Sequence, residues 1–254
     1  MVNPHFHIPY HRIRDYLYFF KKYLLNLEIY FPSNSLDNIR ESDIRRLQED
    51  LDYHPAITFH APFMDLSPGA VDSKVRDVTI EQFSKLFAIA QIFRPKIIVF
   101  HSGYEKWKYA LKIDDWLEGS LITWRHLLPM AEGMDIKIAI ENIFEDDPTN
   151  LRVLMEKIES QYFGICFDTG HFNLFSKRPL EEWLKQIGSF IIELHLHDNN
   201  KSADNHKAIG DGNFNFETLF FMLKDKNLLY TIEAHTPEDA LKSLERLKTY
   251  SLSA

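Results

Sequence analysis

Residues 163–171 read FGICFDTGH, an apolar run that ends in Asp168 and is followed by His171 three positions later. A short, almost wholly apolar run is typical of a parallel strand, because both faces of such a strand are covered. Gly170 is expected to permit a tight turn after the strand. Asp168 and His171 are therefore expected to face one pocket at the end of a buried strand.

The alternation of short apolar runs with longer amphipathic segments continues along the whole chain, as in parallel strands joined by crossover helices. Strands are predicted at Asn3–Ile8, Leu27–Phe31, Ala56–His60, Lys96–His101, Ile136–Asn142, Phe163–Asp168, Phe190–His197 and Leu229–Ala234. Helices are predicted at Ser73–Phe93 and Asp114–Gly133, from Pro148 and Pro179, and at Pro237–Tyr250.

Eight strand–helix units in a chain of 254 residues predict an α/β fold, a single-domain (β/α)8 TIM barrel over residues 1–254. An open doubly wound sheet is the alternative fold, but no GxGxxG follows the first strand.

Composition narrows the class of protein. The net charge of −8 disfavours a general nucleic-acid coat, and the 45% apolar fraction excludes a disordered chain. Cys166 is the single cysteine, which excludes an internal disulfide and a thiolate zinc cluster, and it is expected in the core. No apolar run reaches the length of a membrane span, and the first residues lack the apolar segment of a signal peptide. A cytoplasmic protein is expected.

The chain has 12 histidines against 9 glycines, which is a high frequency of histidine, and six of the predicted strands end in ionisable side chains. These residues are His60, His101, Glu141, Asp168, the group His195, His197 and Asp198, and the pair Glu233 and His235. Strand ends meet at one mouth of such a barrel, where active sites lie. One such histidine alone would be interpreted as a hydrogen-bonded structural residue. Converging carboxylates and imidazoles instead indicate a divalent metal, because burying them without a cation is costly.

Weaker candidates lie near the same mouth. His7 is either a substrate contact or a structural residue, and Tyr104 and Trp107 either stack on a sugar or pack over helices. Arg178, beside Lys177, either binds a phosphate or belongs to a solvated pair. Glu28 is interpreted as structural.

Together these motifs resemble the xylose isomerase-like TIM-barrel superfamily, which includes sugar isomerases and epimerases as well as endonuclease IV. The isomerase and epimerase branch holds one divalent ion, Zn, Mn, Co or Mg, through four residues. The matching residues are Glu141 in IENI, Asp168 in FDTGH, His195 in HLHD and Glu233 in TIEAH.

The resemblance implies an isomerase or epimerase of a sugar, a sugar phosphate or a related hydroxy-carbonyl compound. Glu141 and Glu233 would move a proton through a metal-stabilised enediolate, and His171 would contact the substrate. Under this interpretation His60, His101 and His206 are further substrate contacts. The partner is then a small carbohydrate, and an oligomer is compatible with the fold.

The alternative implied function is a zinc phosphodiesterase of the endonuclease IV type, or another multi-metal hydrolase. That enzyme holds two or three zinc ions here if all nine ligand positions are used. They match His60, His101, Glu141, Asp168, His171, His195, Asp204, His206 and Glu233. The loop APFMDLSPGAVDSKVRD, residues 61–77, is acidic and poor in arginine, and DTGHFN is similar to the sugar branch. Both features disfavour a nucleic-acid substrate.

Overall fold

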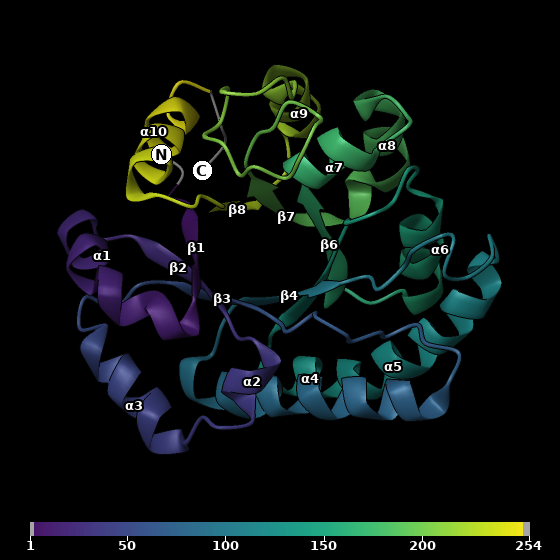
Figure 1. Ribbon diagram of the computed structural model, residues 1–254, viewed down its shortest axis with the longest axis horizontal. Coiled ribbons are helices and arrows are strands. Elements are labelled where there is room, and N and C mark those ends of the chain that lie inside the picture. The colour runs from purple at the N-terminus through teal and green to yellow at the C-terminus, as the bar shows by residue number, and fades with distance from the viewer. Residues whose placement is uncertain (1–2, 251–254) are drawn as a thin grey trace.

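The computed structural model describes residues 3–250, whose strands form a closed parallel barrel in the order β1 to β8 (Figure 1). The strands are β1 His5–Pro9, β2 Asn26–Tyr30, β3 Ile57–His60, β4 Ile97–His101, β5 Lys137–Glu141, β6 Phe163–Asp168, β7 Ile191–Leu196 and β8 Leu229–Ile232. The first and last strands pair directly, with His5 opposite Thr231 and Phe6 opposite Ile232. The predicted TIM barrel is confirmed, and the open sheet is excluded.

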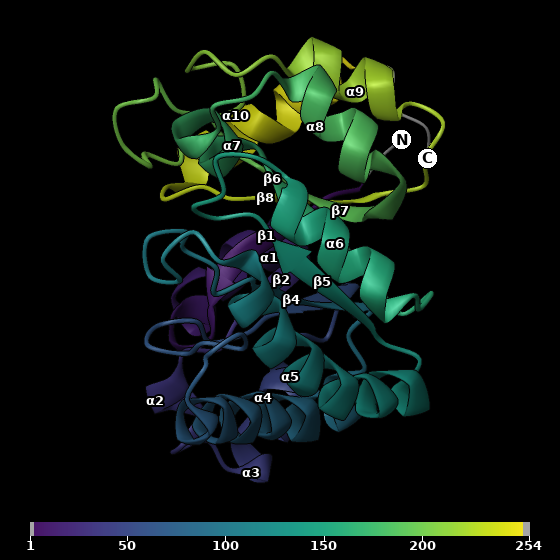
Figure 2. The ribbon, with the colours of Figure 1, turned by 90° about the vertical axis from the view of Figure 1, so that its right-hand side faces the viewer.

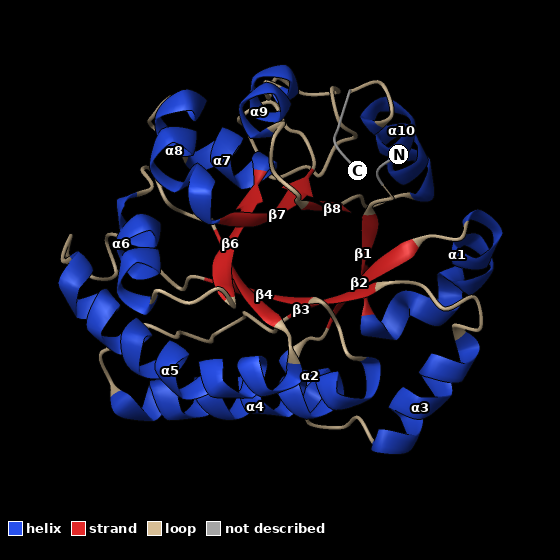
Figure 3. Cartoon of the chain, turned by 180° about the vertical axis from the view of Figure 1, so that it is seen from behind, coloured by secondary structure: helices blue, strands red, loops and turns tan. Residues whose placement is uncertain are grey.

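Helices surround the barrel on its outside (Figure 3). They are α1 Leu17–Tyr23, α2 Ser33–Leu36, α3 Glu41–Asp50, α4 Ser73–Phe93, α5 Ile113–Met134, α6 Thr149–Ile158, α7 Thr169–Phe175, α8 Leu180–Ile187, α9 Phe216–Leu223 and α10 Pro237–Leu247, with short 3-10 helices η1 Tyr10–Tyr16 and η2 Gly188–Phe190. Within residues 3–250, no helix combines the length and the apolar character that a membrane-spanning segment needs.

The predicted boundaries agree closely with these elements. Each predicted strand differs from the observed strand by at most two residues at either end, and α4 has the predicted bounds. Pro237 is the first residue of α10, whereas Pro148 and Pro179 lie directly before α6 and α8. The last helix is shorter than predicted, because α10 ends at Leu247 and not at Tyr250. The predicted domain span of 1–254 includes residues 1–2 and 251–254, which lie outside the described part.

Two apolar clusters occupy the two sides of the sheet. The larger lies between strands and helices, where Phe83 of α4 packs on Phe100 of β4 and on Trp124 of α5, with ring centroids 4.7 and 5.9 Å away. The smaller includes Ile97, Val99, Ala139 and Cys166. Cys166 is fully buried, which confirms its expected place in the core. The barrel is therefore a packed scaffold whose strand ends are rigidly placed.

Two histidines of β1 lie in opposite electrostatic environments. Because side chains alternate along a strand, His5 and His7 lie on the same face of the sheet. Burial lowers the pKa of His5 to about 4, and neither of its ring nitrogens has a hydrogen-bond partner. Burial would also lower the pKa of His7, but the carboxylates of Glu233 and Glu28 raise it to about 10. His5 is therefore neutral near pH 7, whereas His7 is charged when no metal is bound.

This difference predicts a pH dependence of stability. Because the folded-state pKa of His5 lies below its unfolded value, the unfolded chain binds more protons between pH 6.5 and 4. Above pH 6.5 His5 is neutral in both states and does not lower the free energy of unfolding. As the pH falls from 6.5 to 4, His5 is protonated in the unfolded chain first, which lowers the free energy of unfolding by up to about 3 kcal/mol. Urea unfolding at pH 7 and pH 4.5 should show a smaller loss for His5→Gln than for the parent. Equal losses in the two proteins would contradict this assignment.

Candidate active site

A pocket of about 1070 Å³ opens at the carboxyl ends of the strands. The side view of the barrel shows the loops that follow the strands (Figure 2). Ten of the residues selected from the sequence line the pocket: His7, His60, His101, Tyr104, Glu141, His171, Asp204, His206, Glu233 and His235. Asp168 and His195 are fully buried directly beside them. The structure therefore brings the whole predicted nine-residue ligand set to one site.

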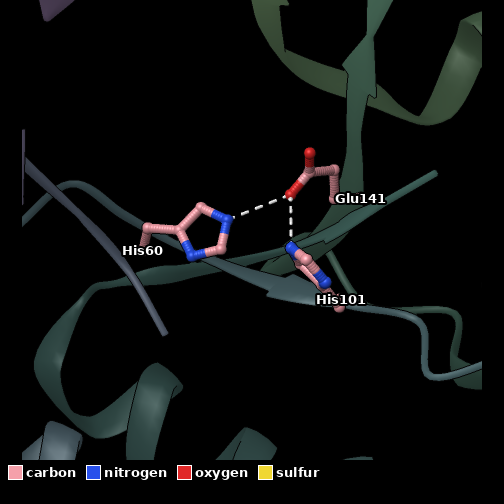
Figure 4. A group of neighbouring side chains, drawn as sticks. All are labelled: His60, His101 and Glu141. Carbon is pink, nitrogen blue, oxygen red and sulfur yellow. Dashed lines mark hydrogen bonds and ion pairs between the residues drawn. The ribbon is translucent and has the colours of Figure 1, made fainter. Parts of the chain in front are cut away.

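Glu141, the last residue of β5, is surrounded by imidazoles. His60 Nε2 and His101 Nε2 lie 3.1 and 3.3 Å from its Oε2 (Figure 4). His171 Nδ1 lies 3.2 Å from its Oε1. Burial alone would raise the pKa of Glu141, but His195 and His101 hold it well below its ordinary range. Glu141 is therefore ionised at neutral pH, despite an exposure of only 1%.

Glu233, the residue after β8, has a similar environment on the other side of the mouth. Its Oε1 lies 3.2 Å from His7 Nδ1 and 3.2 Å from His195 Nδ1. Its Oε2 lies 3.4 Å from His206 Nδ1. Burial would raise the pKa of Glu233, but His195 and His7 hold it well below its ordinary range. Two buried carboxylates from distant strands are thus kept ionised by the histidines between them.

Asp168 ends β6 and caps α7, because its Oδ1 accepts the backbone N–H of His171 at 2.6 Å. His197 Nε2 lies 3.0 Å from both oxygens of the same carboxylate. Gly170 lies in α7, and a Cβ at this position would lie 2.0 Å from the ring of His197. The expectation that Gly170 serves a tight turn is therefore wrong: the residue is needed for the close approach of an imidazole.

Gly170→Ala is expected to destabilise the protein by about 1–3 kcal/mol, because the new methyl group must displace the buried ring of His197. Gly133→Ala is the matched control, since no atom lies within 4 Å of its Cβ position in α5. The control should stabilise the helix by about 0.5–1 kcal/mol. Urea unfolding measures both effects, and a Gly170→Ala variant as stable as the parent would disprove the packing argument.

The loop after β7 carries Asp204 and His206 to the pocket. Asp198 organises the loop, because its carboxylate accepts the backbone N–H groups of Gly210, Gly212 and Phe214 at 3.1, 2.9 and 3.1 Å. His206 Nε2 then lies 3.1 Å from Asp204 Oδ2, and His171 Nε2 lies 3.4 Å from the same oxygen. Asp198 is thus structural and holds the two candidate ligands in place.

Residues 27–250 match the family model described as a xylose isomerase-like TIM barrel. The chain belongs to this family. Protein MJ1311 of Methanocaldococcus jannaschii is 34% identical over 219 residues, which cover 82% of this chain and 74% of that relative.

Two solved structures share the fold. A D-tagatose 3-epimerase-like protein has 30% identity and a TM-score of 0.76, over 91% of this chain and 90% of its own. The TTHB071 protein of Thermus thermophilus, soaked with ZnCl2, has a TM-score of 0.81 over 98% and 97% of the two chains. Its identity of 23% shows the fold alone.

The side chains fit the divalent ion that the xylose isomerase-like family implies. His195 Nδ1 is buried and has no hydrogen-bond partner. It faces three carboxylate oxygens, at 3.5 Å from Glu141 Oε1, 3.9 Å from Asp168 Oδ2 and 3.2 Å from Glu233 Oε1. One imidazole nitrogen and three carboxylates form a donor set that suits Zn, Mn or Co. A cation at this point would compensate charges that are otherwise balanced only by histidines.

The structure does not bring two of the predicted substrate contacts into the pocket. Trp107 is 69% exposed, and Lys106 Nζ lies 5.4 Å from the centre of its ring. Arg178 lies at the surface, where its Nε is 3.9 Å from a carboxylate oxygen of Glu182. Tyr104 does line the pocket, but its ring is buried and stacks on Tyr109 at 5.9 Å. The surface position of Arg178 fits the alternative of a solvated residue, and a substrate contact by Trp107 or Arg178 stays a prediction. The strand pattern does not specify the turns that set the direction of a loop side chain.

Sequence reasoning misses the role of Glu28. The strand pattern suggests a structural residue, but its carboxylate contacts both His7 and His195 inside the barrel. Strand alternation also puts His195 and His197 on one face, so that either could be the ligand, whereas the structure buries both at the site. His195 lies nearer to Glu233, at 3.2 Å, and His197 lies nearer to Asp168, at 3.0 Å. Period-two alternation is the available signal, because Glu193, His195 and His197 share one face of their strand.

Proposed function

We propose that this protein is a divalent-metal-dependent isomerase or epimerase of a sugar or a related hydroxy-carbonyl compound. The observation that carries the proposal is the pair Glu141 and Glu233, two ionised carboxylates that approach His195 Nδ1 from different strands. An epimerase needs one group to take a proton from a carbon and another to return a proton on the opposite face. An ionised carboxylate has oxygen lone pairs that can accept such a proton.

The ion would be held by Glu141, Asp168, His195 and Glu233. When bound, it acts as a Lewis acid that polarises the substrate carbonyl and so acidifies the neighbouring C–H. Glu141 or Glu233 would then accept the proton of the substrate carbon at a carboxylate oxygen. The other carboxylate would return a proton that it takes from the imidazole facing it, His171 for Glu141 or His7 for Glu233. This exchange inverts the configuration of one carbon.

The rest of the pocket suits a polyhydroxylated substrate. His7, His171 and His206 line the pocket and can orient hydroxyl groups. Phe63 stacks on His101 with ring centroids 4.1 Å apart and forms an apolar wall beside these polar groups. Polar groups beside an aromatic surface match a sugar, which has hydroxyl edges and apolar C–H faces. The name of the D-tagatose 3-epimerase-like neighbour supports a ketose as the substrate.

Solvent deuterium exchange tests the proposal. A panel of ketoses is incubated in deuterated water with the protein and with Mn²⁺, Co²⁺, Mg²⁺ or Zn²⁺ in turn. We expect deuterium at a carbon next to the carbonyl, together with a new epimer or isomer. Glu233→Gln is the control for exchange caused by free metal. If no ketose and metal combination gives exchange above this control, the proposed chemistry is wrong.

A second candidate function is a multi-metal phosphodiesterase. It is favoured by the position of His60 and His101, which both lie within 3.3 Å of one oxygen of Glu141, as ligands of a further ion would. The group of His171, Asp204 and His206 is a further candidate. Zinc ions held there would generate hydroxide for hydrolysis. The number of tightly held ions per chain distinguishes the two candidates.

A further inference from the structure

We propose that Glu28 is a positioning residue of the metal centre: its carboxylate accepts the Nε2–H of His195 and directs the Nδ1 lone pair toward the ion. This inference rests on the proposed function, because it concerns the same metal site. It assigns a role to a buried acid in the middle of β2 that is not one of the proposed ligands.

The contact geometry determines which nitrogen is free to bind metal. Both oxygens of Glu28 lie 3.2 Å from His195 Nε2, and both side chains have no exposed surface. An ionised carboxylate can only accept hydrogen bonds, so the proton between these atoms belongs to Nε2. In a neutral imidazole the lone pair is then on Nδ1, which faces Glu141, Asp168 and Glu233. Metal-binding histidines commonly have such a carboxylate on the other ring nitrogen.

Glu28 also holds a second histidine of the site. Its Oε1 lies 3.0 Å from His7 Nδ1, and the same nitrogen lies 3.2 Å from Glu233 Oε1. Thr58 Oγ1 donates a weaker hydrogen bond to Oε2 of Glu28 at 3.4 Å. Glu28 thus anchors the two imidazoles that flank Glu233 Oε1. Its loss would release both rings at once.

A neighbouring acid provides the matched control. Glu193 is also fully buried and lies two residues before His195 on β7. Its Oε1 accepts the hydroxyl proton of Thr231 at 2.7 Å, and its Oε2 has no hydrogen-bond partner. Glu28→Gln and Glu193→Gln therefore make the same substitution at two fully buried positions, although burial and the neighbouring Glu28 raise the pKa of Glu193 well above its ordinary range. They differ in that Glu28 hydrogen-bonds imidazoles, whereas the hydrogen bond of Glu193 is to a hydroxyl group.

Zinc affinity is the first readout, measured by competition with a chromogenic chelator at pH 7. We expect Glu28→Gln and Glu28→Ala to weaken Zn²⁺ binding by about 10–100-fold. Glu193→Gln should remain within about threefold of the parent. Circular dichroism first establishes that each variant is folded. If the Glu28 variants keep the parental affinity, the proposal is wrong. If Glu193→Gln loses as much affinity as Glu28→Gln, the ion lies among Glu28, Glu193 and His195, and the proposal is again overturned.

The second readout needs no variant to fold. Long-range proton–nitrogen NMR of the zinc-loaded parent should show a hydrogen-bonded Nε2–H on His195 and a metal-bound Nδ1. The opposite assignment overturns the proposal. A parent that binds zinc without exchanging ketose protons would disprove the proposed function and leave the role of Glu28 standing. A parent that binds no divalent ion would disprove both.

Discussion

Replacing Glu141 or Glu233 with glutamine is expected to lower turnover by at least about a thousandfold while the barrel remains folded. Glutamine keeps the shape of each side chain but cannot accept a proton from the substrate carbon. Both residues are also proposed ligands, so each variant should hold its ion more weakly. The measurement is the rate of epimer formation at saturating metal, with metal content determined on the same samples.

The metal-free variants test the electrostatics separately. If the carboxylates of the site only repelled one another, removing one charge would relieve that repulsion and stabilise the metal-free protein. In the structure, however, Glu141 and Glu233 each face several histidines within 3.5 Å. We therefore expect each variant to be less stable than the parent by about 2 kcal/mol without metal. Near-parental turnover in either variant would remove it from the proposed proton transfer, and a more stable apoprotein would contradict the charge assignment.

The second large effect concerns the number of ions. We expect the parent to hold one divalent ion per chain, and His60→Ala, His101→Ala and His206→Ala to retain it. Glu141, Asp168, His195 and Glu233 already supply most of a coordination shell, which leaves positions for substrate oxygens. The three variants should raise KM by about tenfold or more through lost contacts to substrate. Metal analysis by mass spectrometry beside the parent provides the measurement.

The opposite result has a clear meaning as well. If each of the three variants loses about one ion per chain and its activity, these imidazoles are ligands of further ions. His60 and His101 would then share Glu141 with a second ion, as their contacts with its Oε2 permit. That outcome would exclude the single-ion isomerase and favour the phosphodiesterase. Tyr104→Phe is a suitable control, because Tyr104 lines the pocket but offers no imidazole or carboxylate ligand.

The barrel could be predicted because each of its strands and helices is specified by residues that lie close together in the sequence. An apolar run such as FGICFD forms a strand wherever it lies in the sheet, and α4 is set by helical spacing of apolar residues over 73–93. The convergence of the candidate site residues could be predicted for a related reason. Residues that end parallel strands, such as Glu141 and Asp168, must meet at one end of a closed barrel.

Only the tertiary structure decided which of those residues touch. Trp107 and Arg178 lie in loops whose direction no periodic pattern specifies, and neither is among the residues that line the pocket. Glu28 has the sequence environment of a structural strand residue, yet it contacts His195, which lies 167 positions later in the chain. That contact exists because the sheet closes on itself and brings β2 and β7 to face each other across the barrel interior. Periodicity specifies which face of a strand a side chain occupies, whereas closure of the barrel determines what lies opposite it.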